Sequence, residues 1–439
     1  GNERSPLFAS ALDRKSMKID QHPEIPGVRE GDRSLGGANP QTEYGLYSIL
    51  YELAQLTGEA VYATEADKAL KYFFIHCQSP RTGLMAWGEH IYWDFIHEGM
   101  GGQDCCHEIC GEWPFWDQCY RLAPDACWKF AIGQWDHQIK SKKTGDFSRH
   151  ARWSSHGPTG GSDFPRYAGQ LILNWADAYA RKENASRDRK EEMIVAIACL
   201  VRRMEENMVQ TKTGYLPAHS GKDYVWSGSN LELARCIWRA APYMNPDLAQ
   251  RMRKLALKQD TDFHKMPHRI TSGGGFASTL HTESGEPRHR SMNKPYTAIW
   301  ATGYGHGTHA GMANKCYSRL RQVQENHREM ATKYVELILA AADQYLDADP
   351  DTSNLLKPDA IAESINLMLN AHEISREEKY IERANHFGQL GVKLFLGDGL
   401  PLPRASNKHD HYEALTGGPA FMHALLELNK RMSHTQPGH

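Results

Sequence analysis

The chain of 439 residues is long enough for two or three average domains, but no Ser/Gly tract, Pro-rich run or block of like charge marks a linker. Its 51 Lys and Arg against 53 Asp and Glu leave a net charge of -2, which argues against binding nucleic acid or a membrane surface through bulk charge. No apolar stretch approaches the roughly 20 residues that span a bilayer. We therefore expect a single domain over residues 1–439, with residues 1–40 as an extended N-terminal segment, and neither a nucleic-acid nor a membrane partner.

The cysteines and the first residues give information about the cellular location of the protein. Nine Cys are an odd number, and they are scattered along the chain, which does not favour a disulfide framework. The sequence begins with Gly1 and Asn2 rather than with Met. We expect an exported protein, periplasmic or extracellular, whose leader has been removed, with a cytoplasmic protein as the alternative.

The sequence contains a repeat. Three stretches with helical apolar spacing are each followed by a Thr-Gly pair, at intervals of 62 and 69 residues. The pairs are Thr82-Gly83, Thr144-Gly145 and Thr213-Gly214. Because glycine adopts the left-handed conformation without a Cβ penalty, each pair is predicted to end a helix.

Between these ends the apolar spacing predicts a second set of helices, in chain order over residues 42–56, 108–122, 167–181, 230–243, 307–320 and 359–372, with a last helix over 412–429. No convincing run of alternating strand residues interrupts them. Six helix pairs and a closing helix predict an all-α fold, an (α/α)6 toroid of helical hairpins, with the closing helix as a seventh, incomplete pair. An open helical solenoid is the alternative, but a period of about 65 residues and unequal loops favour the closed ring.

The predicted loops are strongly unequal in length. Joins within a pair are short, whereas joins between pairs are long, as in 81–107, 146–166, 215–229, 266–306 and 399–411. In a ring of hairpins all joins of one type emerge on one face. The long loops are therefore expected to converge there and to form the functional site.

The long loops are rich in aromatic and cationic residues. Trp and Tyr present flat faces that suit sugar rings, and Arg, Lys and His suit anionic groups such as uronate carboxylates. We predict a poly- or oligosaccharide substrate and no cofactor. The predicted substrate-binding residues are Trp87, His90, Arg149, His150, Arg166, Trp226, Arg290, Arg404, His411 and Tyr412.

Helix pairs that end in Thr-Gly and are followed by loops rich in Trp, His and Arg resemble the six-hairpin toroids of carbohydrate-active enzymes. That group includes unsaturated glucuronyl hydrolases, several polysaccharide lyases and the sugar 2-epimerases. The resemblance covers most of the chain at the level of architecture, and no family-defining motif matches. It implies a chemistry class and no assignment of individual catalytic residues.

β-Elimination on an acidic glycan accounts best for the cationic loops. A lyase must neutralise the uronate carboxylate, remove the α-proton and protonate the leaving oxygen. Tyr304, His306 and His309 lie where the longest loop enters a helix, and we predict Tyr304 and His306 for the proton transfers. The predicted carboxylate clamp comprises Arg149, His150, Arg166 and Arg290.

Three other functions remain as alternatives. A glycoside hydrolase needs a pair of carboxyl groups, and a sugar epimerase or a non-catalytic glycan-binding protein would use the same loops. The abundance of His, which titrates near neutrality, favours proton transfer over binding alone. The candidate carboxyl groups are Glu89, Asp94, Glu98, Asp163, Asp223 and Glu283, of which we retain Glu89 and Glu98 as catalytic candidates.

The segment from Asp104 to Cys110 contains the weaker candidates for a metal site. Cys105, Cys106 and His107 are of the residue types that bind zinc, and adjacent Cys near a Glu distantly resemble the zinc-thiolate site of β-L-arabinofuranosidases. No second Cys pair is spaced to complete four ligands. The sequence therefore predicts no metal.

Overall fold

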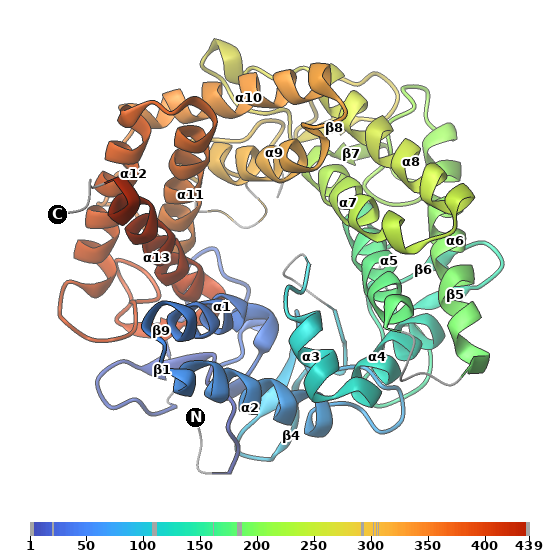
Figure 1. Cartoon of the computed structure of the whole chain (residues 1–439), viewed down its shortest axis with the longest axis horizontal. Coiled ribbons are helices and arrows are strands. Elements are labelled where there is room, and N and C mark those ends of the chain that lie inside the picture. The colour runs from blue at the N-terminus through green and yellow to red at the C-terminus, as the bar shows by residue number, and fades with distance from the viewer. Residues whose placement is uncertain are drawn as a thin grey trace.

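The structure, a computed structural model, describes residues 4–19, 22–107, 112–160, 162–181, 187–290, 294–301, 303, 305 and 307–435. Viewed down its short axis, the molecule is a ring of paired helices (Figure 1). In each pair the odd-numbered helix lies on the inside of the ring and the even-numbered helix on the outside, and α13 closes the ring beside α1. The predicted toroid of six pairs with a closing helix is confirmed.

The helices are separated by short joins within each pair. Their bounds are α1 Pro40–Thr57, α2 Ala60–His76, α3 Trp116–Leu122, α4 Pro124–His137, α5 Pro165–Ala180, α6 Arg187–Val209, α7 Ser227–Ala240, α8 Pro246–Lys265, α9 His309–Val323, α10 Arg328–Leu346, α11 Pro358–Ser375, α12 Glu378–Gly391 and α13 Gly418–Thr435.

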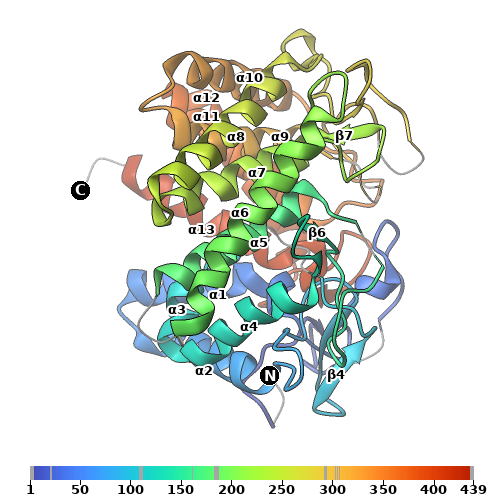
Figure 2. The same ribbon diagram turned by 90° about the vertical axis from the view of Figure 1, so that its right-hand side faces the viewer.

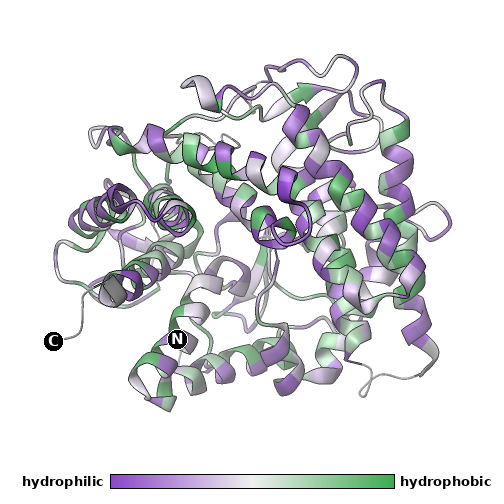
Figure 3. Ribbon diagram, turned by 45° about the horizontal axis from the view of Figure 1, so that its top comes forward, coloured by the Kyte–Doolittle hydropathy of each residue, from purple (hydrophilic) through white to green (hydrophobic). Residues whose placement is uncertain are grey.

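Local sequence explains where the helices begin and which faces they bury. Proline, which has a suitable φ and needs no amide partner there, stands in the first turn of α1, α4, α5, α8 and α11. Most helices carry apolar and polar residues on different sides (Figure 3). The apolar sides pack into two buried clusters, one formed largely by α1 to α8 and one by α7 to α13.

Two of the predicted helices begin later than expected. Residues 108–111 of the predicted 108–122 helix lie outside the described residues, and α3 occupies only Trp116–Leu122. The prediction for 412–429 is wrong at its start, because Tyr412 lies in a strand and α13 begins at Gly418. Apolar side chains of this strand pack into the core, and so short an apolar pattern does not distinguish a strand from a helix.

Short strands, which the sequence did not predict, decorate the ring. They pair as four small sheets in the described part of the chain: β1 with β9, β2 with β3 and β4, β5 with β6, and β7 with β8. Their bounds are β1 Ala11–Asp13, β2 Gly37–Ala38, β3 Ile91–Asp94, β4 Gly99–Gly102, β5 Ile139–Ser141, β6 Asp146–Phe147, β7 Tyr224–Trp226, β8 Thr279–His281 and β9 His411–Glu413.

The Thr-Gly pairs mark tight turns and not helix ends, which corrects the sequence interpretation. Gly83, Gly145 and Gly214 all have φ between 70° and 75°, as expected, but the preceding helices end several residues earlier. A Cβ on Gly83 would lie 2.5 Å from the carbonyl oxygen of Lys129 in α4, and one on Gly145 would lie 2.8 Å from that of Cys199 in α6. These turns therefore pack against the next outer helix along the ring.

The seam of the ring joins segments from opposite ends of the sequence. Strand β1 pairs antiparallel with β9, with Ala11 opposite Glu413. Next to this pair, the buried Arg33 guanidinium lies 2.7 Å from the Glu413 carboxylate. The fully buried Arg14 binds the carboxylates of Asp398 and Asp410. These ion pairs thus connect the N-terminal segment with the last long loop and with β9.

The long loops gather on one face of the ring, as predicted. In the side view, the segments that carry β4, β6 and β7 lie together on the right (Figure 2). None of the helices in the described residues is long and apolar enough to cross a membrane.

Candidate functional site

Two long loops bring a group of ionisable side chains together on the loop face. Glu89 and His90 lie just before β3, and Arg149 and His150 follow β6. Backbone pairing holds the loops in place: Gly88 bridges to His107, and the preceding residue, Cys106, bridges to Ala151. The imidazole rings of His90, His107 and His150 have centroids 4.9 to 6.0 Å apart.

His90 is oriented by an acid from the N-terminal segment. Its backbone has φ +70, a strained conformation for a residue with a side chain. Nδ1 of His90 lies 2.9 Å from Oδ1 of Asp32, a close ion-pair contact whose angle falls short of a hydrogen bond. Nε2 lies 3.6 Å from Oε2 of Glu89. The carboxylate of Asp32 favours the tautomer with the proton on Nδ1, which leaves the Nε2 lone pair directed toward Glu89.

His150 has its lone pair available in the same way. Nδ1 lies 2.8 Å from the carbonyl oxygen of Gly160, so Nδ1 carries the proton and donates it. Nε2 is buried and has no hydrogen-bond partner among the described residues. Burial, together with the nearby His107 and Arg149, lowers the pKa of His150 to about 3. The imidazole is therefore neutral over the physiological pH range.

Glu89 is ionised and is shared with His107. Oε2 of Glu89 lies 2.7 Å from Nε2 of His107. Burial opposes ionisation of Glu89, but the hydrogen bond and charge of His107, with His90 and Arg149, hold its pKa at about 2. Burial lowers the pKa of His107 to about 4, and Glu89 only partly offsets this. At neutral pH a carboxylate thus faces a neutral imidazole.

Arg149 adds a fixed positive charge to the site. Its Nε lies 2.9 Å from Nε2 of His107, and its guanidinium lies over the Phe164 ring at 4.3 Å. Because Nε2 of a neutral His107 has one position for a proton, it either donates to Glu89 or accepts from Arg149. The hydrogen bond in the structure is the one that Nε of Arg149 donates, so Nε2 of His107 accepts it, and Oε2 of Glu89 lies in close contact with the same nitrogen.

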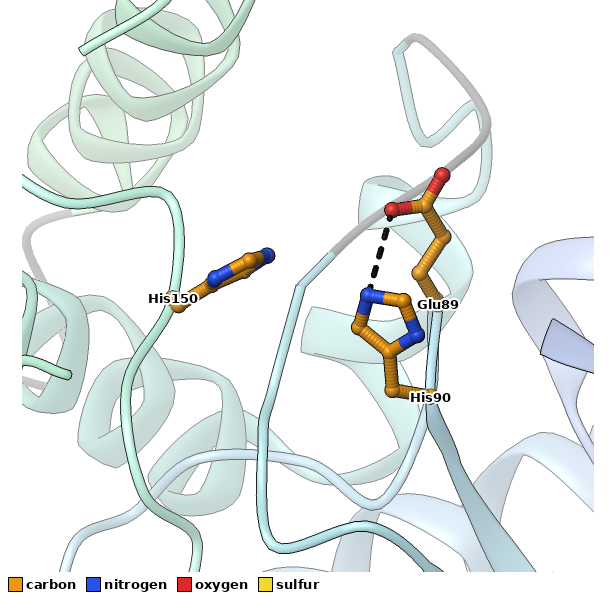
Figure 4. A group of neighbouring side chains, drawn as sticks. All are labelled: Glu89, His90 and His150. Carbon is orange, nitrogen blue, oxygen red and sulfur yellow. Dashed lines mark ion pairs between the residues drawn. The ribbon is translucent and has the colours of Figure 1, made fainter. Parts of the chain in front are cut away.

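Glu89, His90 and His150 form a group with the geometry of a metal site. One ligand atom from each residue lies within 4.8 Å of the other two. Figure 4 shows His150 on one loop directed toward Glu89 and His90 on the other. Two imidazoles and one carboxylate suit a divalent first-row transition metal. Each imidazole has its other nitrogen directed at an oxygen, which is the arrangement that positions histidine ligands.

The other predicted catalytic residues lie away from this cluster or outside the residues that the structure describes. Tyr304 and His306 are outside the described residues. His309 is 3% exposed, and its Nδ1 is 2.7 Å from the Thr297 hydroxyl, so it is packed in the ring wall. Glu98 lies in the β3–β4 turn and accepts weak hydrogen bonds from Trp93 and Tyr72, 3.4 Å away in each case.

Two of the predicted aromatic sugar platforms are core residues. Trp87 is 1% exposed and stacks on Phe73, and Tyr412 is 2% exposed. Trp226 is half-buried and packs against Phe164, which also contacts Arg149. Of the three, Trp226 is therefore the one that lies beside the site.

The remaining predicted cations divide into two groups. Arg404 forms ion pairs with Asp398 and Asp410, and the buried His411 contacts Glu413, so both belong to the seam. Arg290 lies over the Tyr224 ring at 3.8 Å. Arg166, at the start of α5, lies close enough to act electrostatically on His107 and on Glu232 of α7.

The cysteine candidates do not assemble a metal site in the described residues. The thiol of Cys106 is buried and donates to the carbonyl oxygen of Met85, and burial raises the pKa of Cys105. Of the three candidates from this segment, His107 alone reaches the cluster. Three of the predicted hydrolytic acids serve local structure: Asp94 binds backbone amides of its own turn, Asp163 contacts Ser220, and Asp223 pairs with Arg288.

The sequence did not predict Asp32, nor that Glu89, His90 and His150 form one group. Glu89, His90 and His150 were each predicted for the site, but as separate catalytic or sugar-binding residues. Asp32 lies in a short 3-10 helix, Glu30–Asp32, far from the loops in sequence. The signal that could have found the group is the concentration of His in two loops predicted to converge.

Comparison with known proteins gives one partial family match. The profile of a family described as periplasmic pectate lyase matches residues 5–165, less than half of the chain. The matched segment contains Asp32 and the whole cluster: Glu89, His90, His107, Arg149 and His150.

Solved structures resemble the whole chain only distantly. A D-mannose isomerase is 11% identical, with a TM-score of 0.48 and coverage of 98% of this chain and 93% of that chain. A sugar epimerase from a ruminal bacterium is 10% identical, with a TM-score of 0.49 and the same coverages. An α-1,6-mannanase from Salegentibacter sp. HEL1_6 is 10% identical, with a TM-score of 0.45, covering 92% of this chain and 95% of that chain. Likenesses at this level carry no assignment of substrate or reaction.

Proposed function

We propose that the protein is a polysaccharide lyase that cleaves a uronate-containing glycan by β-elimination at the cluster of Glu89, His90 and His150, with a divalent metal ion held by these three residues. The observation that carries the proposal is the pair of oriented imidazoles, His90 and His150, whose ligand atoms lie within 4.8 Å of one another and of an oxygen of the Glu89 carboxylate. The match of residues 5–165 to a pectate lyase family supports the substrate class.

The chemistry of elimination fits the charges of the site. A base removes the proton α to the uronate carboxylate, the oxygen at the β carbon leaves with a proton from an acid, and a carbon–carbon double bond forms; Tyr304 and His306 remain the residues proposed for these two proton transfers. A bound cation of this kind draws negative charge from the substrate carboxylate, which acidifies the α-proton. Arg149 adds a second positive charge beside the same carboxylate position.

The protein residues hold this site in a fixed geometry. Asp32 and the carbonyl oxygen of Gly160 fix the tautomers of His90 and His150. Nε2 of His107, 2.7 Å from Oε2 of Glu89, limits the rotation of this carboxylate. Because these contacts exist before any ligand binds, little reorganisation is needed when the substrate carboxylate enters.

The test is an assay of polygalacturonate cleavage with and without added Mn²⁺. We expect an unsaturated product with ultraviolet absorbance, loss of that product after chelation, and recovery on adding Mn²⁺. His150→Ala should lower turnover by at least about 100-fold, whereas His97→Ala, an exposed histidine on the β3–β4 hairpin, should not change it. Reducing ends without unsaturated product would support hydrolysis and contradict the proposal, and unchanged turnover in His150→Ala would contradict it too.

Export is also proposed, on the family description alone. A periplasmic location would place the enzyme where an extracellular polyuronate or its fragments arrive. Fractionation of cells that produce the full-length gene product, with immunodetection in periplasmic and cytoplasmic fractions, tests this.

A further inference from the structure

The inside of the ring contains two adjoining cavities away from the three-residue metal group. One, of about 590 Å³, is lined by residues of α1, α7, α9 and α11, and the other, of about 280 Å³, lies between α9, α11 and the loop before α9. Three residues line both cavities: Gly311, Lys315 and Glu363. Together the cavities have the size of a site for a small ligand.

A carboxyl group enters the cavities at their junction. Gly311 leaves the space for it, because a Cβ there would lie 2.9 Å from Oε1 of Glu363. Thr308 caps α9 by accepting from the Gly311 amide, and its hydroxyl donates to Oε2 of Glu363. Glu363 is therefore held with one oxygen bound to the wall and the other directed at the helix face that lines the cavity.

The surroundings of Glu363 keep this carboxyl protonated up to neutral pH. Burial raises its pKa to about 7; the hydrogen bond from Thr308 opposes this increase, the charge of Asp359 adds to it, and Lys315 and Lys357 partly offset it. Burial raises the pKa of Tyr345, in α10, and the charge of Glu363 adds to this increase. Below pH 7 the group is a hydrogen-bond donor in a cavity that also contains an ammonium group.

Lys315 supplies the positive charge at the junction. It is 36% exposed, and its Nζ lies 2.5 Å from Oε1 of Glu232. Burial raises the pKa of Glu232, but Lys315 and Arg235 outweigh it and hold the pKa at about 2. Glu232 therefore stays ionised and keeps Lys315 directed into the larger cavity. Tyr44 of α1 adds an aromatic wall to the same cavity.

We propose that the ring interior is a second binding site, which takes the carboxylate of an acidic monosaccharide unit between the Lys315 ammonium and the Glu363 carboxyl. The Lys315 ammonium, which is also paired with Glu232, donates to the ligand carboxylate, and the protonated Glu363 carboxyl donates its O–H to a ligand oxygen. The class of ligand rests on the proposed function, whereas the site itself rests on the cavities and these two side chains. Arg166 acts electrostatically both on His107, beside Glu89, and on Glu232, which lines the larger cavity.

Binding of D-galacturonate to metal-free protein, followed by isothermal titration calorimetry at pH 6 and pH 8, tests the site. Because Glu363 loses its proton near pH 7, we expect affinity to fall about tenfold at pH 8, with proton uptake on binding at that pH. Glu363→Gln keeps a hydrogen-bond donor at both pH values, so its affinity should not depend on pH. Lys315→Met should lose at least about tenfold in affinity.

The controls separate this site from the loop-face cluster. His150→Ala should bind D-galacturonate like the wild type, and D-galactose, which lacks the carboxylate, should bind at least about tenfold more weakly. Loss of binding in His150→Ala, equal binding of D-galactose, or a pH dependence unchanged by Glu363→Gln would overturn the interior site. Failure of elimination in the polygalacturonate assay would overturn the proposed function and leave this binding result standing.

Discussion

At the scale of single residues, burial decides which predicted side chains lie in the candidate site and which belong to the core. Glu89 and His150 were chosen from the sequence because their loops were expected to converge, and they lie in one cluster. Trp87 was chosen for the same reason but is a core residue, because residue type and loop position do not reveal burial. Asp32 could not be predicted, since its contact with His90 depends on how the N-terminal segment lies across the ring.

Asp32→Asn tests the contact that orients His90. The amide keeps the shape of the side chain but removes the charge that favours the Nδ1 proton, so we expect Mn²⁺ affinity to fall about 10- to 100-fold. Metal titration of the variant and the wild type measures this. Asp223→Asn, which breaks an exposed pair with Arg288, is the matched control and should keep wild-type affinity. Equal affinities in Asp32→Asn and the wild type would remove Asp32 from the site.

Glu43→Gln tests a buried acid in α1. Burial raises the pKa of Glu43 from 4.5 to about 7, although Ser10 and the Asn39 amide donate to Oε1, and Oε2 has no hydrogen-bond partner among the described residues. Since the folded pKa lies above the unfolded one, the native state gains its extra stability below pH 4.5 and loses it as pH rises to 7. That loss amounts to about 3 kcal/mol.

The glutamine variant carries no charge at this position at any pH. We therefore expect the free energy of unfolding of Glu43→Gln, relative to the wild type, to rise by up to about 3 kcal/mol between pH 4.5 and pH 7.5. Urea unfolding at several pH values measures the difference. A difference that stays constant with pH would show that Glu43 titrates as it does in the unfolded chain.

At the scale of elements, apolar periodicity predicted the helices and could not predict the strands. Helices such as α8 and α10 bury one side over four turns or more, which leaves a pattern in the sequence. Strands of two to four residues, such as β2 and β6, form only where another segment lies alongside. The Thr-Gly pairs were recognised as a repeat, but their role as packed turns depends on the neighbouring helix.

Replacing the turn glycines by alanine separates backbone strain from packing. All three glycines have positive φ, so each alanine variant should lose about 1 to 2 kcal/mol of stability. Gly83→Ala and Gly145→Ala should lose roughly 1 to 3 kcal/mol more, because the new Cβ would meet backbone of α4 or α6. Gly214→Ala is the control, since the nearest atom to its Cβ is Nζ of Lys258 at 3.8 Å. Equal losses in chemical unfolding of the three variants would contradict the packing role.

At the scale of the whole molecule, the helix repeat predicted the ring, and the inequality of the loops predicted that the long loops gather on one face. The means of closing the ring was not predictable, because β1 and β9 are short and lie at opposite ends of the sequence. The interior cavities were also missed, since Lys315 and Glu363 lie on helices and the prediction considered loops alone.

Arg33→Met tests the seam. The Arg33 and Glu413 side chains are each 1% exposed, so removing the guanidinium leaves a buried carboxylate with His411 as a remaining partner. We expect a loss of about 3 to 5 kcal/mol, partly recovered in the double variant Arg33→Met/Glu413→Gln. Arg321→Met, from a pair in which the arginine is 57% exposed, should cost less than about 1 kcal/mol. Similar losses in Arg33→Met and Arg321→Met would show that the seam adds little to stability.

The pairing of β1 with β9 also sets an order of events in the cell. Residue 11 leaves the ribosome early, but its partner at residue 413 is made only after most of the chain. Neighbouring helix pairs can fold as they emerge, because their contacts are local, whereas the seam closes a loop of nearly the whole sequence. We therefore expect the seam to form last during synthesis. Until then the N-terminal segment, which includes the Asp32 beside His90, would lack its β9 partner and be open to proteolysis, so the proposed site would be complete only after β9 is made.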